Sequence, residues 1–269
     1  MRQEAYAAFT HRERRADRRR GITIEPYGDM AIVVPCYNEA ERFNAAAFEE
    51  FLNRYKDINF VFVNDGSKDD TLAELQVFSA RFPRQTSVLD MPKNGGKAEA
   101  VRHGMLEMIS HNKRYIGYWD ADLATALSAI PEFGTLIRRD GQHTVVVGAR
   151  LRLLGHDIQR DLSRRIFSRA FNLVARATLR LRIRDTQCGA KLFEVDEDLK
   201  AALVHPFETG WLFDIELLQR LIERKGNRKF IYEHALFAWS EVAGSKVSLK
   251  KSLHAVFKLC LLGLRGARL

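Results

Sequence analysis

The stretch FVFVNDGSKDDT, residues 60–71, contains the transition that decides the fold class of this chain. Four apolar residues run directly into Asn64, Asp65 and Gly66, and a helix-like segment begins after Ser67. An unbroken apolar run bounded by turn residues is typical of a strand buried on both faces, and acidic residues favour a first helical turn. The stretch therefore predicts a buried strand, a polar turn and then a helix.

The same alternation recurs along the chain. It predicts strands at residues 30–35, 58–65, 86–91, 115–120 and 143–150, the first stopped by Pro35. Helical patterns fill residues 39–55, 67–82, 96–110 and 127–139. Strands that alternate with helices indicate an α/β fold with a mostly parallel sheet covered on both faces.

Composition limits the classes of protein to consider. With 269 residues, 46% of them hydrophobic, the chain can bury one substantial core, and its net charge of +9 favours an anionic partner. Three cysteines without a CxxC spacing predict reduced thiols and a cytosolic setting. We find no signal peptide, no run long enough to span a membrane, and no signature of a nucleic-acid-binding module.

Three regions differ in character. Residues 1–25 form an arginine-rich extension, residues 26–240 carry the α/β pattern, and residues 241–269 read as a basic amphipathic helix. Residues 157–183 have the same basic amphipathic character, which suits an anionic membrane surface. The other interpretation of this segment is an ordinary helix that covers the core. Together the two segments predict peripheral attachment at the cytoplasmic face of a membrane.

Carboxylates follow two of the predicted strands. Asp65 ends one of them, and Asp120 and Asp122 follow another in the motif DAD. Ligands of open α/β sheets bind beyond the carboxyl ends of the strands, and two carboxylates with substrate phosphates commonly hold Mg²⁺. Taken alone, either motif could be only a turn and a helix cap.

A glycine pair and a lysine begin the helix at residues 96–110. In KNGGKAEA, residues 93–100, backbone amides and the Lys97 ammonium together suit a diphosphate. The spacings of a Walker P-loop and of a dinucleotide-binding GxGxxG motif are both missing from the chain. ATPase and dehydrogenase interpretations therefore lose support.

Nine ordered blocks between about residue 29 and residue 250 resemble glycosyltransferase family 2, in the branch of dolichyl-phosphate glucosyltransferases and dolichol-phosphate mannose synthases. The blocks are VVPCYNEAERF, VNDGSKDDT, NGGKAEAVRHGM, DADLAT, VVVGARL, RRIFSRAFN, DTQCGAKLF, WLFDIELL and AGSKV. The resemblance implies a GT-A fold, with a catalytic domain over residues 26–240, and metal-dependent inverting transfer from a nucleotide-sugar. The block DTQCG favours the glucosyltransferase side and hence a UDP-sugar such as UDP-glucose.

The resemblance also implies how the donor would be bound. Lys97 would meet the nucleotide, Asp120 the ribose or the metal, and Asp122 the metal, which would be Mg²⁺ or Mn²⁺. The remaining donor-binding residues would line the nucleoside pocket or bond the base, and they are Pro35, Tyr37, Glu39 and Asp65. The mannose synthases have a metal-binding glutamine where this chain has Ala124, which puts a complete protein ligand set in doubt.

On the acceptor side, the resemblance implies a membrane lipid, most simply polyprenyl phosphate. Arg164 and Ser168 match the group that grips the acceptor phosphate, and Arg150 matches the arginine that ends the corresponding strand and would bracket that phosphate with Arg164. Asp185 and Gln187 belong to DTQCG. An acceptor hydroxyl on a glycolipid, diacylglycerol or glycan would instead need a general base.

Asp214 or Glu216 would be that base, although both could equally be an ordinary helix cap and a solvated carboxylate. A third possibility is a catalytically silent, lipid-docked interaction protein that retains the fold. The intact Asp65, Lys97, Asp120 and Asp122 argue against it.

Overall fold

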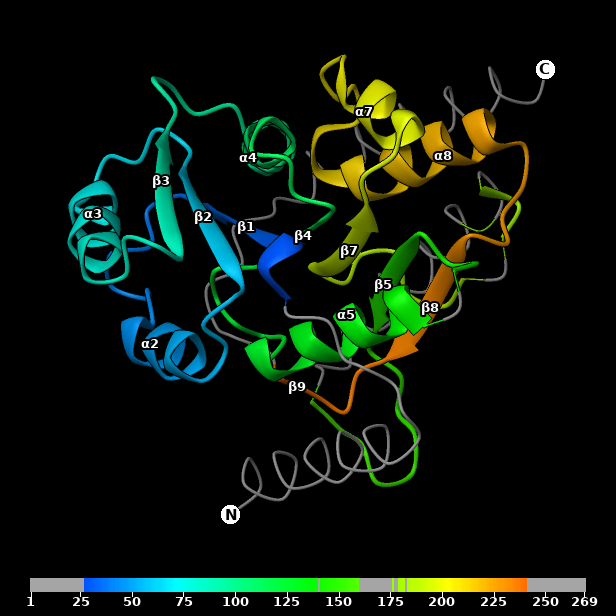
Figure 1. The fold of residues 1–269 in the computed structure, drawn as a ribbon, viewed down its shortest axis with the longest axis horizontal. Coiled ribbons are helices and arrows are strands. Elements are labelled where there is room, and N and C mark those ends of the chain that lie inside the picture. Colours follow the sequence, from blue (N-terminus) through cyan, green and yellow to red (C-terminus); the bar gives the residue numbers. More distant parts are fainter. Residues whose placement is uncertain (1–26, 140, 160–175, 177–178, 182, 241–269) are drawn as a thin grey trace.

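A computed structural model describes residues 27–139, 141–159, 176, 179–181 and 183–240 (Figure 1). The predicted N-terminal extension at 1–25 and the predicted helix at 241–269 lie outside the described residues. So do Arg164 and Ser168, and with them most of the amphipathic segment at 157–183.

A seven-stranded sheet forms the centre of the molecule, in the order β3-β2-β1-β4-β7-β5-β8. All pairings are parallel except those that β7 makes with β4 and β5. The predicted α/β class with a mostly parallel sheet is confirmed, and the antiparallel β7 was not foreseen. The strands are β1 (Met30–Cys36), β2 (Asn59–Asn64), β3 (Thr86–Asp90), β4 (Tyr115–Trp119), β5 (Val145–Ala149), β7 (Ala190–Glu194) and β8 (Ile231–Ala235).

Helices cover both faces of this sheet, and each face has its own apolar cluster. Short 3₁₀ turns at Tyr27–Asp29, Leu127–Ala129 and Gly210–Leu212 complete the described helical structure. On one face lie α4 (Lys97–Ser110), α7 (Glu197–Leu203) and α8 (Phe213–Lys225), and on the other α2 (Ala45–Arg54), α3 (Thr71–Arg81) and α5 (Ile130–Arg139) (Figure 1).

The first strand does not stop at Pro35, as the sequence predicted, but continues to Cys36. Pro35 pairs in register with Val63 of β2, whereas the pairing of β1 with β4 already ends at Val33. A proline is tolerated where a strand is paired on one side only, because the missing N–H then costs no bond on the other side.

A second, two-stranded sheet pairs β6 (Asp157–Gln159) with β9 (Ala238–Ser240) in parallel. The prediction of a helix beginning at Asp157 is therefore wrong for its first three residues, because Asp157, Ile158 and Gln159 form β6. Among the described residues, none of the helices is long and apolar enough to cross a bilayer.

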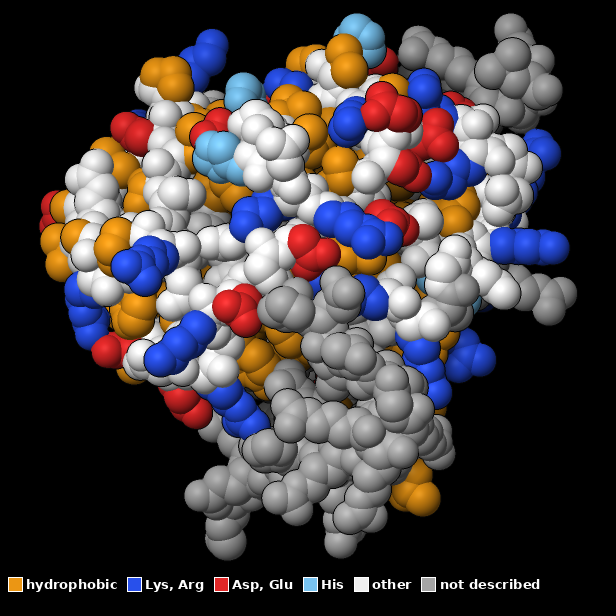
Figure 2. Space-filling model, viewed as in Figure 1, with side chains coloured by type: hydrophobic (Ala, Val, Ile, Leu, Met, Phe, Trp, Pro, Cys, Tyr) orange, Lys and Arg blue, Asp and Glu red, His pale blue; other side chains and the backbone are white. Residues whose placement is uncertain are grey.

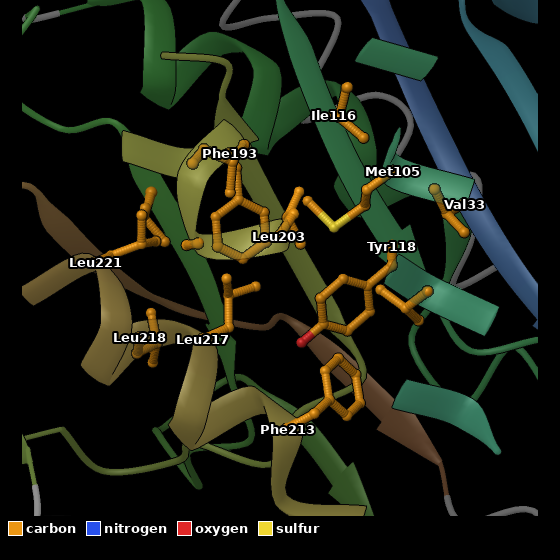
Figure 3. Packing of buried hydrophobic residues seen from close by; sticks show 14 of the residues in the cluster. Val33, Met105, Ile116, Tyr118, Phe193, Leu203, Phe213, Leu217, Leu218 and Leu221 are labelled. Atoms are coloured by element: carbon orange, nitrogen blue, oxygen red, sulfur yellow. The ribbon is translucent and has the colours of Figure 1, made fainter. Parts of the chain in front are cut away.

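The core beneath α8 places aromatic rings next to the carboxyl end of β4. Figure 3 shows Tyr118 of β4 facing Phe213 of α8, with the tyrosine hydroxyl directed toward that helix. The two ring centroids are 5.5 Å apart. This contact fixes the start of α8 over the end of β4, where the candidate site lies.

Candidate functional site

Asp65, directly after β2, fastens the glycine loop that precedes α4. Its buried carboxylate accepts hydrogen bonds from the backbone amides of Gly95 at 2.6 Å and Gly96 at 2.9 Å, and from the Asn94 side chain at 3.1 Å. Burial raises the pKa of Asp65, and the two glycine amides oppose that rise. These contacts tie the end of β2 to the glycine loop of KNGGKAEA, which precedes α4.

Gly66 explains why this junction needs a glycine. Its φ is +61°, and a Cβ atom there would lie 2.5 Å from the backbone nitrogen of Asn94 and 2.6 Å from the carbonyl carbon of Lys93. Only a residue without a side chain allows the two backbones to approach so closely. The turn after β2 and the loop before α4 therefore form one packed unit.

The nucleoside residues proposed at the end of β1 are tied to the same turn. The Glu39 amide donates to Thr71 Oγ1 at 2.8 Å, and the Asn38 amide donates to Ser67 Oγ at 3.0 Å. Pro35 and Tyr37 lie in the same segment, beside the end of β2. The structure therefore brings Pro35, Tyr37, Glu39 and Asp65 to one edge of the sheet.

Lys97 and Asp120 form an ion pair at this edge. The Lys97 ammonium lies 2.5 Å from Asp120 Oδ1, over the rings of Tyr118 and Phe213. Burial alone would lower the pKa of Lys97, but Asp120, Asp214 and Asp122 raise it, so this lysine stays charged. Figure 2 shows acidic and basic side chains gathered near the middle of the face in view, beside the region drawn grey.

Asp122 is turned back toward its own backbone. Its Oδ1 accepts a hydrogen bond from the Ala124 amide at 3.0 Å, and burial, together with the charge of Asp120, raises its pKa. Two carboxylates that repel each other fit a hard divalent cation, which prefers oxygen ligands. Over the described part of the chain, no group of three or more His, Cys, Asp or Glu side chains could hold a metal. A cation there would need oxygen atoms from substrate or water as well.

Gly189, the last residue of DTQCG, lies directly against Asp120. A Cβ atom at Gly189 would come within 1.8 Å of Asp120 Oδ2, and the Asp120 amide donates to the Gly189 carbonyl at 3.1 Å. The glycine therefore provides the space that the Asp120 carboxylate occupies. Gly189 lies in a recognisable motif, but its role depends on this contact with Asp120 and has no local pattern.

The first residue of the same motif, Asp185, holds Arg150 at the end of β5. The guanidinium is bound at two points, with Nε to Oδ2 at 2.6 Å and Nη2 to Oδ1 at 2.8 Å, and the Arg150 amide adds a third bond at 3.0 Å. Burial would lower the pKa of Arg150, but Asp185 raises it. Within the described part of the chain, the Asp185 side chain engages two of the five guanidinium N–H groups.

Gln187 lies in the chain between Asp185, which binds Arg150, and Gly189, which packs against Asp120. Its backbone amide donates to Asp185 Oδ1 in a long hydrogen bond of 3.3 Å. Its side-chain nitrogen Nε2 is buried without a hydrogen-bond partner among the described residues. A buried donor without a partner is costly unless a ligand or water completes it. The arrangement is compatible with the acceptor role predicted for Gln187.

Glu233 on β8 supports the backbone at the start of this motif, and no local pattern in the sequence points to it. Its Oε1 accepts hydrogen bonds from the amides of Arg184 at 2.7 Å and Asp185 at 2.8 Å. Burial raises the pKa of Glu233, and the two amides oppose the rise. Asp185 is thus held both by its side chain and by its backbone.

Asp214, the candidate general base, is buried in an ionic cluster. It accepts hydrogen bonds from the Tyr118 hydroxyl and from the ammonium of Lys191, the latter at 2.8 Å, and Lys191 also donates to the Cys188 carbonyl at 2.7 Å. Burial raises the pKa of Asp214 to about 7 and lowers that of Lys191 to about 7. Lys191 was missed because the strand AKLFE shows no sign of a functional lysine.

Glu216, the other candidate base, supports the local fold. It accepts hydrogen bonds from the amide of Glu208 at 3.1 Å, the amide of Thr209 at 2.8 Å and the hydroxyl of Thr209 at 2.7 Å, and it pairs with Arg220 at 2.6 Å. Four donors on one buried carboxylate fix the turn before α8. The alternative of a solvated helical carboxylate is wrong for Glu216, which is 2% exposed.

Comparison with known sequences matches this arrangement to a family. The model of glycosyl transferase family 2 matches residues 31–199, which include all of β1 but its first residue, β2 to β5, Arg150 and all of DTQCG. The chain belongs to glycosyltransferase family 2. The transferase is 32% identical over 245 residues to a dolichyl-phosphate beta-glucosyltransferase of Trichomonas vaginalis, covering 85% of this chain and 71% of that one. The dolichyl-phosphate beta-glucosyltransferase of Saccharomyces cerevisiae is 29% identical over 245 residues, covering 82% of this chain and 69% of that one.

Solved structures resemble the transferase in fold. Glucosyl-3-phosphoglycerate synthase of Mycobacterium tuberculosis, in complex with Mn²⁺ and UDP-glucose, superposes with a TM-score of 0.61 at 18% identity, covering 88% of this chain and 78% of that one. The mannosyltransferase PcManGT of Pyrobaculum calidifontis, in complex with GDP-Man and Mn²⁺, superposes with a TM-score of 0.57 at 16% identity, with 91% and 66% covered. The expected GT-A fold and the assignment as a glycosyltransferase are confirmed.

Proposed function

We propose that this transferase moves glucose from UDP-glucose to polyprenyl phosphate, with inversion at the sugar carbon and in a reaction that depends on a divalent cation. One observation carries the proposal. The segment at 185–189 holds Arg150 at one end and packs under Asp120 at the other. A chain of five residues spans at most about 17 Å, so Arg150 and the proposed donor carboxylates border one site.

The donor would lie beside Lys97, Asp120 and Asp122. These two aspartates would hold the cation, which when bound would neutralise the diphosphate oxygens of the donor. Lys97 stays protonated and would stabilise the negative charge that develops on the departing UDP. The turns after β1 and β2, which carry Tyr37, Glu39 and Asp65, would receive the nucleoside.

The acceptor would need cations more than a base. A phosphate monoester is already anionic, since its second pKa is about 6, and its oxygen can attack the sugar carbon as UDP leaves. Arg150 and Gln187 would bind that phosphate, together with Arg164 and Ser168 by resemblance. Asp214 is engaged by Tyr118 and Lys191, which favours a phosphate acceptor over a hydroxyl acceptor.

The relatives support the choice of substrates. Those from Trichomonas, yeast and human are all named dolichyl-phosphate beta-glucosyltransferases. We further propose that residues 26–240 form the catalytic unit and that the enzyme works as a peripheral protein at the cytoplasmic face of a membrane.

A donor and acceptor panel tests the function. UDP-glucose, UDP-galactose and GDP-mannose are each offered with polyprenyl phosphate, a free polyprenol or diacylglycerol, with Mg²⁺ or Mn²⁺ and with EDTA. We expect transfer from UDP-glucose to the phosphate only, and its loss in EDTA. Transfer to a hydroxyl lipid, or undiminished activity in EDTA, would overturn the corresponding part of the proposal.

A variant at Arg164 sharpens the acceptor assignment. Arg164→Ala should strongly depress transfer to polyprenyl phosphate while leaving UDP binding, measured by calorimetry, nearly unchanged. Wild-type transfer by this variant would contradict a phosphate grip at Arg164.

A further inference from the structure

A tight turn of apolar residues projects from the molecule directly after Arg150. The His156 amide donates to the Leu153 carbonyl at 3.0 Å, which closes a β-turn with Leu154 and Gly155 at its centre. Gly155 has φ +84°, a value that glycine adopts without strain. The turn is thus a built feature, and it places Leu154 at its tip.

Large apolar side chains are exposed on this turn and beside it. Leu154 is 105% exposed and Leu153 is 45% exposed, while most large apolar side chains of the described chain are buried. Phe237, 42% exposed, lies across from them, because its carbonyl accepts from the Asp157 amide at 2.9 Å and its ring contacts His156 at 5.6 Å. We call Leu153, Leu154 and Phe237 the apolar tip.

The apolar tip adjoins the acceptor side of the site. The segment that carries it begins at Arg150, whose guanidinium is bound to Asp185 and lies 5.2 Å from the ring of Trp239 on β9. Figure 1 shows this segment, in green, running from the end of β5 to the lower edge of the molecule near β9. Two exposed arginines are close in sequence to the Arg150–Asp185 pair: Arg152 follows Arg150, and Arg184 precedes Asp185.

We propose that the apolar tip inserts into the interfacial layer of an anionic lipid bilayer and so brings Arg150 to the membrane surface. This inference rests on the proposed function, since a lipid acceptor must be met at that surface. Leucines on a projecting turn, an exposed arginine next to them in the chain at Arg152, and a net charge of +9 combine the apolar and the basic contributions that hold peripheral proteins at anionic membranes.

The shape of the tip favours a bilayer over a protein partner. Specific protein interfaces generally bury more than about 1,000 Å² with complementary surfaces, which a single projecting turn does not offer. A bilayer needs no complementary shape, and it accepts a few apolar side chains at a time.

Vesicle sedimentation with the full chain tests the inference. The double variant Leu153→Ser/Leu154→Ser is compared with wild type on vesicles of phosphatidylcholine with and without phosphatidylglycerol. The matched control is Val77→Ser, since Val77 is 67% exposed but lies on α3. We expect the partition coefficient of the double variant into the anionic vesicles to be lower than that of wild type by a factor of about ten or more. The control should behave as wild type.

Further measurements separate this inference from the proposed function. UDP binding and transfer to a short-chain, water-soluble prenyl phosphate should be unchanged in the double variant. Wild-type vesicle binding by that variant, or equal loss in Val77→Ser, would overturn the inference. Loss of UDP binding or of transfer to the soluble acceptor would also overturn it, because the turn would then belong to the active site. If wild type transfers no sugar to any polyprenyl phosphate, the proposed function fails, while a selective loss of vesicle binding would still support membrane insertion.

Discussion

Asp120 and Asp122 are one residue apart in DAD, yet their surroundings give them different tasks. Asp120 is already neutralised by Lys97 and lies against Gly189, whereas Asp122 has one backbone amide bond and a raised pKa. A carboxylate with an unfavourable negative charge gains most from a cation. Asp122 is therefore the side chain on which metal dependence should depend most.

Replacing Asp122 by asparagine tests this assignment. Asp122→Asn keeps an oxygen for the Ala124 amide but removes the negative charge, so we expect transfer to fall at least about a hundredfold with the melting temperature nearly unchanged. The control is Asp57→Asn at an exposed carboxylate outside the site. Full activity in Asp122→Asn would remove Asp122 from the metal site.

Replacing Gly189 by alanine tests the space beneath Asp120. The added Cβ would meet Asp120 Oδ2 at 1.8 Å, so the carboxylate must move and its pairing with Lys97 is disturbed. We expect Gly189→Ala to lose about as much activity as Asp120→Ala. The double variant should be no worse than either single variant, because neighbouring residues that act through one contact are not additive. Additive losses in the double-mutant cycle would show that Gly189 acts elsewhere.

At the scale of elements, the pair Lys191–Asp214 joins β7 to the start of α8 and, through Tyr118, to β4. Lys191 also donates a hydrogen bond to the Cys188 carbonyl. It thereby holds the motif DTQCG, which contacts Arg150 at one end and Asp120 at the other. We infer that Asp214 positions these elements rather than removing a proton from the acceptor.

Stability measurements distinguish the two roles of Asp214. Asp214→Asn leaves the buried Lys191 ammonium without its counterion, and breaking such pairs costs about 3 to 5 kcal/mol in the free energy of unfolding. The apolar double variant Lys191→Met/Asp214→Leu should be less destabilised, because no charge remains buried. Denaturant unfolding of both variants provides the comparison. Wild-type stability of Asp214→Asn, with transfer abolished, would instead support a general base.

The close packing of the turn after β2 against the loop before α4 leads to a prediction at Gly66. Gly66→Ala combines a positive φ with a clash at 2.5 Å, whereas Gly226, with φ +65°, has open space around it. Gly226→Ala should cost about 1 kcal/mol in unfolding free energy, from backbone strain alone. Gly66→Ala should cost clearly more, and it should weaken UDP binding because the loop at 93–96 must move. Equal effects of the two substitutions on calorimetric UDP binding would contradict this coupling.

At the scale of the whole molecule, the antiparallel β7 unites two groups of parallel strands. One group, β3-β2-β1-β4, carries the proposed donor residues at its carboxyl ends, and the other, β5-β8, carries Arg150 and Glu233. The segment before β7 crosses between these groups, which is why DTQCG contacts both. The arrangement allows one loop to organise donor and acceptor sides together.

The net charge of +9 leads to a prediction about salt. Attraction to an anionic membrane weakens as the ionic strength rises, because the screening length falls to about 3 Å at 1 M salt. Transfer to polyprenyl phosphate in anionic vesicles should therefore decline steeply with added NaCl, while transfer to a water-soluble acceptor should decline much less. Equal salt dependence with both acceptors would argue against an electrostatic contribution from the membrane.

The sequence by itself determined the fold class and the position of Asp65 and Asp120 at the ends of buried strands, because both depend on local pattern. Apolar runs that end in Asp65 or Asp120 indicate buried strands with polar ends, and parallel strands place those ends at one edge. Ordered motifs extended this to the family, which the match over residues 31–199 confirms. The predicted end of the first strand at Pro35 was wrong, because a proline ends a strand only where its missing N–H would be needed by a neighbouring strand.

Only the tertiary structure decided what the motifs do to one another. Lys191 and Glu233 look like ordinary strand residues, and their roles follow from burial against Asp214 and against the backbone of Asp185. The place of β7 between β4 and β5 could not be predicted, since pairing between strands distant in sequence leaves no local pattern. Asp214 likewise reads as a base or a helix cap until its partners are known. Long-range contacts set these partners, and so decide whether a charge is available for chemistry or holds the fold together.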